Sequence, residues 1–169
     1  MDSVIGNITK DDKLRDEYKM LCQSGLCEKI VISRLESQRV RMRKTTNKGT
    51  DVGLTLPPGT VLRNRDIIYL TKEKTIVVEI EPENVAVLSL RSSEDDHELF
   101  AKAVRIGHAL GNLHRPIKID GAKIYVPIQA DTEIELLHKI FEKIHVHLEI
   151  TRTKTVFEAE EGTPTHEHT

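Results

Sequence analysis

Histidine is absent from the first 96 residues of this 169-residue chain, and cysteine occurs only twice. No apolar run approaches the roughly 20 residues that span a bilayer, and the amino terminus lacks the basic flank and apolar core of a signal peptide. We therefore expect a cytoplasmic protein with no membrane partner. Cys22 and Cys27 are too few and too close together to indicate a disulfide scaffold, so we expect reduced thiols.

A strong excess of positive charge is also missing, since the net charge is -2 and the pI is near 6.5. Phosphate binding leaves a basic footprint, so this balance argues against a nucleic-acid partner. The sequence contains no His-Glu-x-x-His, no phosphate-binding loop, and no cysteine close to a histidine. These absences argue against a metal hydrolase or a thiol enzyme, and we expect no catalytic activity.

The first half of the chain contains several short predicted strands. Apolar and basic side chains alternate over residues 39–43, the stretch 45–51 is rich in turn formers, and further strands are expected over 52–56, 66–70 and 75–80. We predict a small all-β domain over 1–82, preceded by a polar extension at 1–26 that is weakly helical over 10–21. The alternation predicts one buried and one cationic face on the strand at 39–43.

A second pattern begins near residue 83 and runs to 157. It consists of a strand at 84–91, a helix at 98–110, a hairpin of strands 117–120 and 123–127, a second helix, and a last strand with Val146, Leu148 and Ile150 on one face. The order β-α-β-β-α-β predicts a four-stranded antiparallel sheet covered by two helices on one side. Residues 158–169 are acidic and polar, and we expect a flexible tail.

The segment 107–116 joins the first of these helices to the hairpin. Gly111 and Asn112 both tolerate positive φ, so we expect them to end the helix in a left-handed cap, and Pro116 prevents its continuation. His114 is then held on a rigid turn, where it can be offered to solvent, to a metal or to a second subunit. The alternative is an idle histidine favoured at a helix end by the helix dipole.

The run Gly111-Asn112-Leu113-His114-Arg115-Pro116 resembles the Gly-Asn-x-His-x-Pro signature of the UreE-type urease accessory proteins, and the resemblance extends through nearly the whole chain. It implies that His114 is a nickel ligand, that the protein is a homodimer, and that residues 83–157 are a ferredoxin-like domain for metal binding and dimerisation. The stretch 41–54 is similar to the amino-terminal domain of that family, which is thought to bind peptide or a partner protein. A solvated basic face is the alternative there.

All eight histidines lie in the second half, so any imidazole site should be there. One imidazole binds nickel weakly, and a two-fold axis that pairs His114 with its copy is the simplest remedy. We expect His166 and His168 of the tail to complete the site, the alternatives being a disordered end or a remnant of a purification tag. His145 and His147, two apart on the last predicted strand, are a secondary candidate pair, unless they are simply its outer face.

Imidazole ligands without a thiolate suit Ni²⁺, Zn²⁺ or Cu²⁺, and the choice of nickel comes from the resemblance. The resulting interpretation is a urease accessory metallochaperone that binds Ni²⁺ at a homodimer interface and delivers it, through a GTPase accessory protein, to the urease apoprotein. The rival hypothesis is a binding or dimerisation module that uses no metal.

Overall fold

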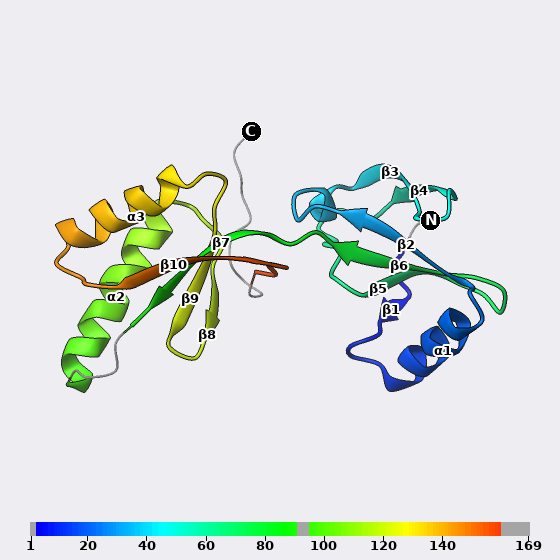
Figure 1. Cartoon of the computed structure of the whole chain (residues 1–169), viewed down its shortest axis with the longest axis horizontal. Helices are drawn as coiled ribbons and strands as arrows, with labels where there is room; N and C mark the ends of the chain where they lie inside the picture. Colours follow the sequence, from blue (N-terminus) through cyan, green and yellow to red (C-terminus); the bar gives the residue numbers. More distant parts are fainter. Residues whose placement is uncertain (1–2, 91–94, 160–169) are drawn as a thin grey trace. The chain divides into compact units, whose positions relative to one another are not determined.

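The computed structural model describes residues 3–90 and 95–159 of the chain (Figure 1). The residues divide into two compact units, Met1–Glu81 and Pro82–Thr169. None of the helices in the described ranges has the length and apolar character needed to cross a membrane.

The first unit is β-rich. Its strands are β1 (Gly6–Asn7), β2 (Cys27–Ile32), β3 (Arg41–Thr45), β4 (Asp51–Thr55), β5 (Asp66–Leu70) and β6 (Thr75–Ile80). Four of them form a sheet in the order β1-β5-β6-β2, in which β2 runs parallel to β6, while β3 and β4 form a separate antiparallel pair. Buried side chains of β5 and β6, such as Ile67 and Val77, form part of the core.

The weak helical character expected over 10–21 is confirmed as a helix, α1 (Asp12–Gln23). Because this helix packs within the first unit, the expectation of an all-β domain was wrong. The Asp11 side chain accepts a hydrogen bond from the Leu14 N–H at 3.0 Å and so caps the helix. Leu14 and Leu21 are buried. A Cβ atom at Gly6 of β1 would lie 2.9 Å from Cδ2 of Leu14, so a larger residue there would require the Leu14 side chain to move. The first 26 residues therefore contain two elements of the fold.

The expectation of reduced cysteines was also wrong, because Cys22 and Cys27 form a disulfide. Cys22 lies near the end of α1, and Gly25, with φ +72°, reverses the chain so that Cys27 can open β2. The two Cα atoms are consequently 4.8 Å apart, within the range that a disulfide spans. The turn at Gly25 thus brings two cysteines that are close in sequence to bonding distance in space.

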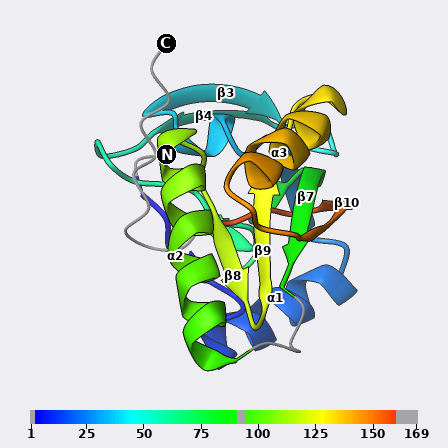
Figure 2. The ribbon, with the colours of Figure 1, turned by 90° about the vertical axis from the view of Figure 1, so that its left-hand side faces the viewer.

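The second unit follows the predicted order of elements. They are β7 (Glu83–Ser89), α2 (Asp96–Asn112), β8 (Lys118–Asp120), β9 (Lys123–Pro127), α3 (Thr132–Lys143) and β10 (Glu149–Thr155). The sheet has the order β10-β7-β9-β8, and every neighbouring pair is antiparallel. Both helices cover the same face of this sheet (Figures 1 and 2). Ile106 and Leu110 of α2 and Leu137 and Phe141 of α3 fill the core between them and the strands.

Candidate metal centre

His114 lies just beyond the end of α2, in a left-handed conformation with φ +51°. The prediction that Gly111 and Asn112 would adopt this conformation was wrong, because α2 continues through both residues. This continuation carries Leu113 onto the buried side of the helix, where it packs against the core of the second unit. The left-handed conformation therefore falls at His114, two residues beyond Asn112, and the His114 N–H closes the turn by donating to the Gly111 carbonyl at 3.0 Å.

The residues that follow His114 hold the turn in place. The Arg115 guanidinium forms an ion pair with the Glu133 carboxylate of α3 at 2.5 Å and donates to the Pro127 carbonyl at 3.5 Å. Pro116 is buried. His114 itself is exposed. An exposed imidazole between anchored neighbours is suited to bind an ion shared with another molecule, because the backbone beneath it is already ordered.

Sequence reasoning missed a second feature of α2, which is an apolar stripe on its exposed side. Phe100 and Val104 are 72% and 55% exposed, and Gly107 and Gly111 continue the same stripe toward His114. The spacing of these four residues is four, three and four, which is the spacing of a helix face that meets another helix. This spacing is visible in the sequence, but it does not belong to the buried stripe by which the helix was predicted.

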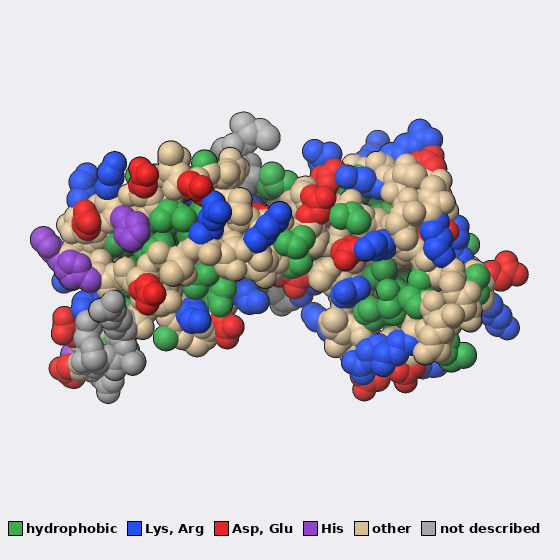
Figure 3. Space-filling model, viewed as in Figure 1, with side chains coloured by type: hydrophobic (Ala, Val, Ile, Leu, Met, Phe, Trp, Pro, Cys, Tyr) green, Lys and Arg blue, Asp and Glu red, His purple; other side chains and the backbone are tan. Residues whose placement is uncertain are grey.

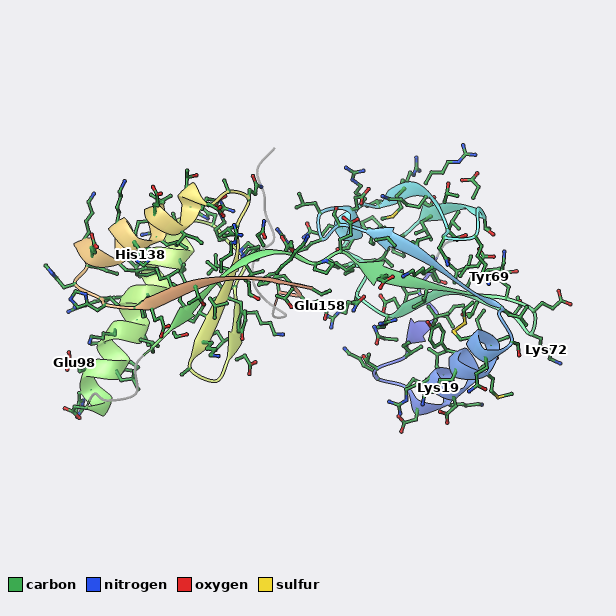
Figure 4. All side chains as sticks on the ribbon, in the orientation of Figure 1. Lys19, Tyr69, Lys72, Glu98, His138 and Glu158 are labelled. Atoms are coloured by element: carbon green, nitrogen blue, oxygen red, sulfur yellow. A yellow bond between two sulfur atoms is a disulfide. The ribbon has the colours of Figure 1, made fainter. Side chains whose placement is uncertain are left out.

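Two further histidines flank this stripe on α2. His97 and His108 are both exposed, and the Asn112 side-chain amide donates a hydrogen bond to the His108 ring at 3.2 Å. His138 projects from α3 (Figure 4), and the described histidines all belong to the second unit (Figure 3). Among residues 3–90 and 95–159, no three His, Cys, Asp or Glu side chains are already grouped tightly enough to hold a metal ion.

His145 and His147 do not share a strand, so the argument that paired them was wrong. The last strand, predicted to include Val146, begins only at Glu149. His145 ends α3 in a left-handed conformation with φ +54°, and its N–H donates to the Glu142 carbonyl, while the Val146 N–H donates to that of Phe141. These two bonds form a Schellman motif.

His166 and His168 lie outside the described residues.

The basic strand β3 of the first unit is less cationic than its sequence predicts. Arg43 forms an ion pair with Asp51 of β4, and Lys44 pairs with Glu36 at 2.7 Å. The hydrogen bonds from Arg43 lower the pKa of Asp51, and those from Lys44 lower that of Glu36. The exposed Arg41 remains as the cation at the start of the strand.

The turn that joins β3 to β4 is fixed by a buried carboxylate. Glu28 of β2 is 7% exposed, pairs with Lys74 at 2.7 Å, and accepts a hydrogen bond from the Thr46 hydroxyl at 2.6 Å. The hydrogen bond from Lys74, followed by those from Thr46 and Thr50, lowers the pKa of Glu28 to about 2. Part of the stretch 41–54 that carries the resemblance therefore has a structural role.

The two-unit fold, with an exposed imidazole at the end of α2, defines a two-domain protein that presents a candidate ion ligand on its second domain. The model of the UreE urease accessory protein N-terminal domain matches residues 1–81, and that of the C-terminal domain matches residues 81–169. The chain belongs to the UreE urease accessory protein family.

Individual relatives agree with this assignment. The chain is 34% identical over 134 residues to the urease accessory protein UreE of Natronomonas pharaonis, which covers 79% of this chain and 61% of the relative. It is 30% identical over 136 residues to the protein of that name from Yersinia aldovae, and 29% identical to that from Yersinia pestis, with 78% and 57% covered in both cases. The chain thus spans about six tenths of the length of the curated relatives it matches.

Proposed function

We propose that the protein is a cytoplasmic, non-catalytic nickel carrier for urease maturation, and that two copies bind one Ni²⁺ between their His114 side chains. Family membership supports the urease accessory role. The observation that carries the site is the exposure of His114 on an anchored left-handed turn. An isologous two-fold axis near this residue supplies two imidazoles from one sequence position.

The exposed stripe of α2 supports the same axis. Phe100 and Val104 supply apolar area that a second copy can cover, and the absence of side chains at Gly107 and Gly111 allows two helices to approach closely. Close packing near the end of α2 would bring the two His114 residues together. We call this α2 face, made of Phe100, Val104, Gly107 and Gly111, the seam.

Two histidines are too few for tight binding, and we propose that His166 and His168 supply the remaining imidazoles. A site completed by the carboxyl-terminal segment is easier to open than a closed four-ligand structural site, which suits an ion that must be passed on. Zn²⁺ and Cu²⁺ would compete for the same imidazoles, since intrinsic affinity favours copper over nickel.

We further propose that the ion passes to the urease apoprotein through a GTPase accessory protein, and that the first unit docks this partner. Exposed apolar side chains support such a surface, since Leu35 and Val61 are 44% and 46% exposed. The segments that carry them are joined by one backbone hydrogen bond, from the Leu62 N–H to the Ser37 carbonyl at 2.9 Å. For the second unit we propose a ferredoxin-like topology, which the strand order β10-β7-β9-β8 supports.

The rival hypothesis is a dimerisation module that uses no metal, and equilibrium dialysis against Ni²⁺ and Zn²⁺ separates the two. A carrier retains about one Ni²⁺ per dimer, whereas a module without metal retains neither ion.

Gly111→Leu tests the seam within the same experiment. A Cβ atom at Gly111 meets nothing within 4 Å in the protomer, and leucine favours the helix, so the protomer should still fold.

We expect Gly111→Leu to be monomeric in sedimentation equilibrium and to lose most of its nickel. Lys139→Leu, which adds the same side chain to an exposed position of α3, is the matched control and should remain dimeric with its nickel. A Gly111→Leu protein that dimerises and binds nickel like the unmodified chain would rule out the seam as the binding interface.

A further inference from the structure

The second unit is hollowed on the side of α3 that faces the beginning of β10. The cavity measures about 90 Å³ and lies between the carboxyl-terminal half of α3 and residues 146–150. Its apolar lining includes Phe141 and Val146, which are each 2% exposed. Its polar lining consists of three side chains, His138, Glu142 and His147.

The backbone explains why these three residues line one cavity. His138 and Glu142 are four residues apart on α3, so they lie one above the other on the same helix face. The Schellman motif at His145 then reverses the chain, and the burial of Val146 fixes the start of the returning segment. His147 is the next residue after Val146 and lies beside α3. Helix or strand periodicity in the sequence does not predict this position.

We propose that His138, Glu142 and His147 form a second metal site, which takes a divalent transition-metal ion of the zinc class. Two imidazoles and one carboxylate are a known three-ligand set for Zn²⁺, with water in the fourth position. Two ligands at positions i and i+4 of one helix are also a recurrent arrangement for this ion. The apolar wall of Phe141 and Val146 would exclude water from one side of the ion.

The three donors are free to close on an ion. All three side chains are exposed, and among the described residues no hydrogen bond or ion pair engages any of them. They line the cavity without converging on one point, so the site forms by rotation of exposed side chains about an ordered backbone. Their exposure also means that substitution should leave the fold intact.

This second site does not depend on the seam, and the test removes the seam site first. The background is the full chain carrying His114→Gly, His166→Ala and His168→Ala. Zn²⁺ is titrated into it by calorimetry, and the imidazole signals are followed by nitrogen-15 NMR. We expect one Zn²⁺ per chain, with the ring signals of His138 and His147 shifting together.

Single substitutions in this background identify the ligands. His138→Ala, Glu142→Gln and His147→Ala should each weaken Zn²⁺ binding at least tenfold. His97→Ala, which removes another exposed histidine of the same unit, is the matched control and should leave the affinity unchanged.

Two results would overturn the proposal. The first is a background protein that binds no Zn²⁺. The second is Zn²⁺ binding that survives His138→Ala but is lost in His145→Asn, a substitution that keeps a residue tolerant of positive φ, because it would show that His145 and His147 are the ligands. Neither result bears on nickel binding by the unmodified dimer, so this proposal and the proposed function fail independently.

Discussion

Replacing His114 with glycine should separate metal binding from folding. His114 has φ +51°, a conformation that costs an L-amino acid roughly 1–2 kcal/mol and costs glycine almost nothing. Glycine also gives the unfolded chain more conformational freedom, which offsets about 0.4–1 kcal/mol of the stability gained by relieving the backbone strain. We therefore expect His114→Gly to fold as well as the unmodified protein, or to be more stable by up to about 1.6 kcal/mol.

Nickel binding should respond in the opposite direction. The substitution removes one ligand from each copy, and the loss of even an outer-shell partner of a metal ligand typically costs 10–100-fold in affinity. We expect the nickel affinity of the dimer to fall more than 100-fold, equivalent to about 2.7 kcal/mol. Isothermal titration calorimetry measures the affinity. Thermal unfolding measures the stability, where 1 kcal/mol shifts the midpoint of a domain of this size by about 4–8 °C.

His145→Gly is the matched control for this experiment. His145 ends α3 as His114 ends α2, with φ +54°, so glycine should have the same effect on stability there. Nickel binding at the seam should be unchanged. If His114→Gly binds nickel with unchanged affinity and stoichiometry, or if both glycine variants lose nickel equally, His114 is not the specific ligand and the reasoning is refuted.

Three further predictions concern the rest of the chain. Deletion of residues 163–169 should lower nickel affinity or stoichiometry in calorimetry and leave the dimer intact in sedimentation; an unchanged affinity and stoichiometry would exclude the tail histidines as ligands. Glu28→Gln should destabilise the first unit by roughly 1.5–3 kcal/mol at pH 7 in urea unfolding, because it weakens a charged hydrogen-bond network. Since the pKa of Glu28 is about 2, below its ordinary 4.5, this stabilisation is present above pH 4.5 and is lost as the pH falls toward 2, so a difference that persists at pH 2 would argue against the ion pair. Replacing both Cys22 and Cys27 with serine should cost about 2 kcal/mol, the loop-closure value for so short a loop, without affecting nickel binding; an unchanged urea midpoint would contradict it.

Local patterns in the sequence located most elements of the second unit. The helix predicted over 98–110 is α2, and the hairpin at Gly121 joins β8 and β9. These predictions succeed because helix and strand periodicities are properties of neighbouring residues. The same reasoning placed His114 beyond the end of a helix, which is where the structure has it.

Local patterns did not predict where α2 ends or where the last strand begins, and both boundaries shape the candidate sites. Gly111 and Asn112 favour a cap, but the packing of the partly buried Leu113 against the core outweighs that preference, and the left-handed residue is His114. The last strand starts late because the Val146 N–H is used to end α3. Tertiary packing overrides local propensity at the end of α2. At the end of α3, a local helix cap delays the start of the strand instead.

The sequence by itself determined the kind of protein, through the run 111–116, the placement of every histidine after residue 96, and the strand and helix order of the second unit. Only the tertiary structure decided which side chains meet: the disulfide of Cys22 and Cys27, the ion pair of Arg115 with Glu133, and the cavity shared by α3 and the segment before β10. The physical reason is that backbone preference acts over a few residues, whereas a binding site requires side chains brought together by turns and by the burial of a common core.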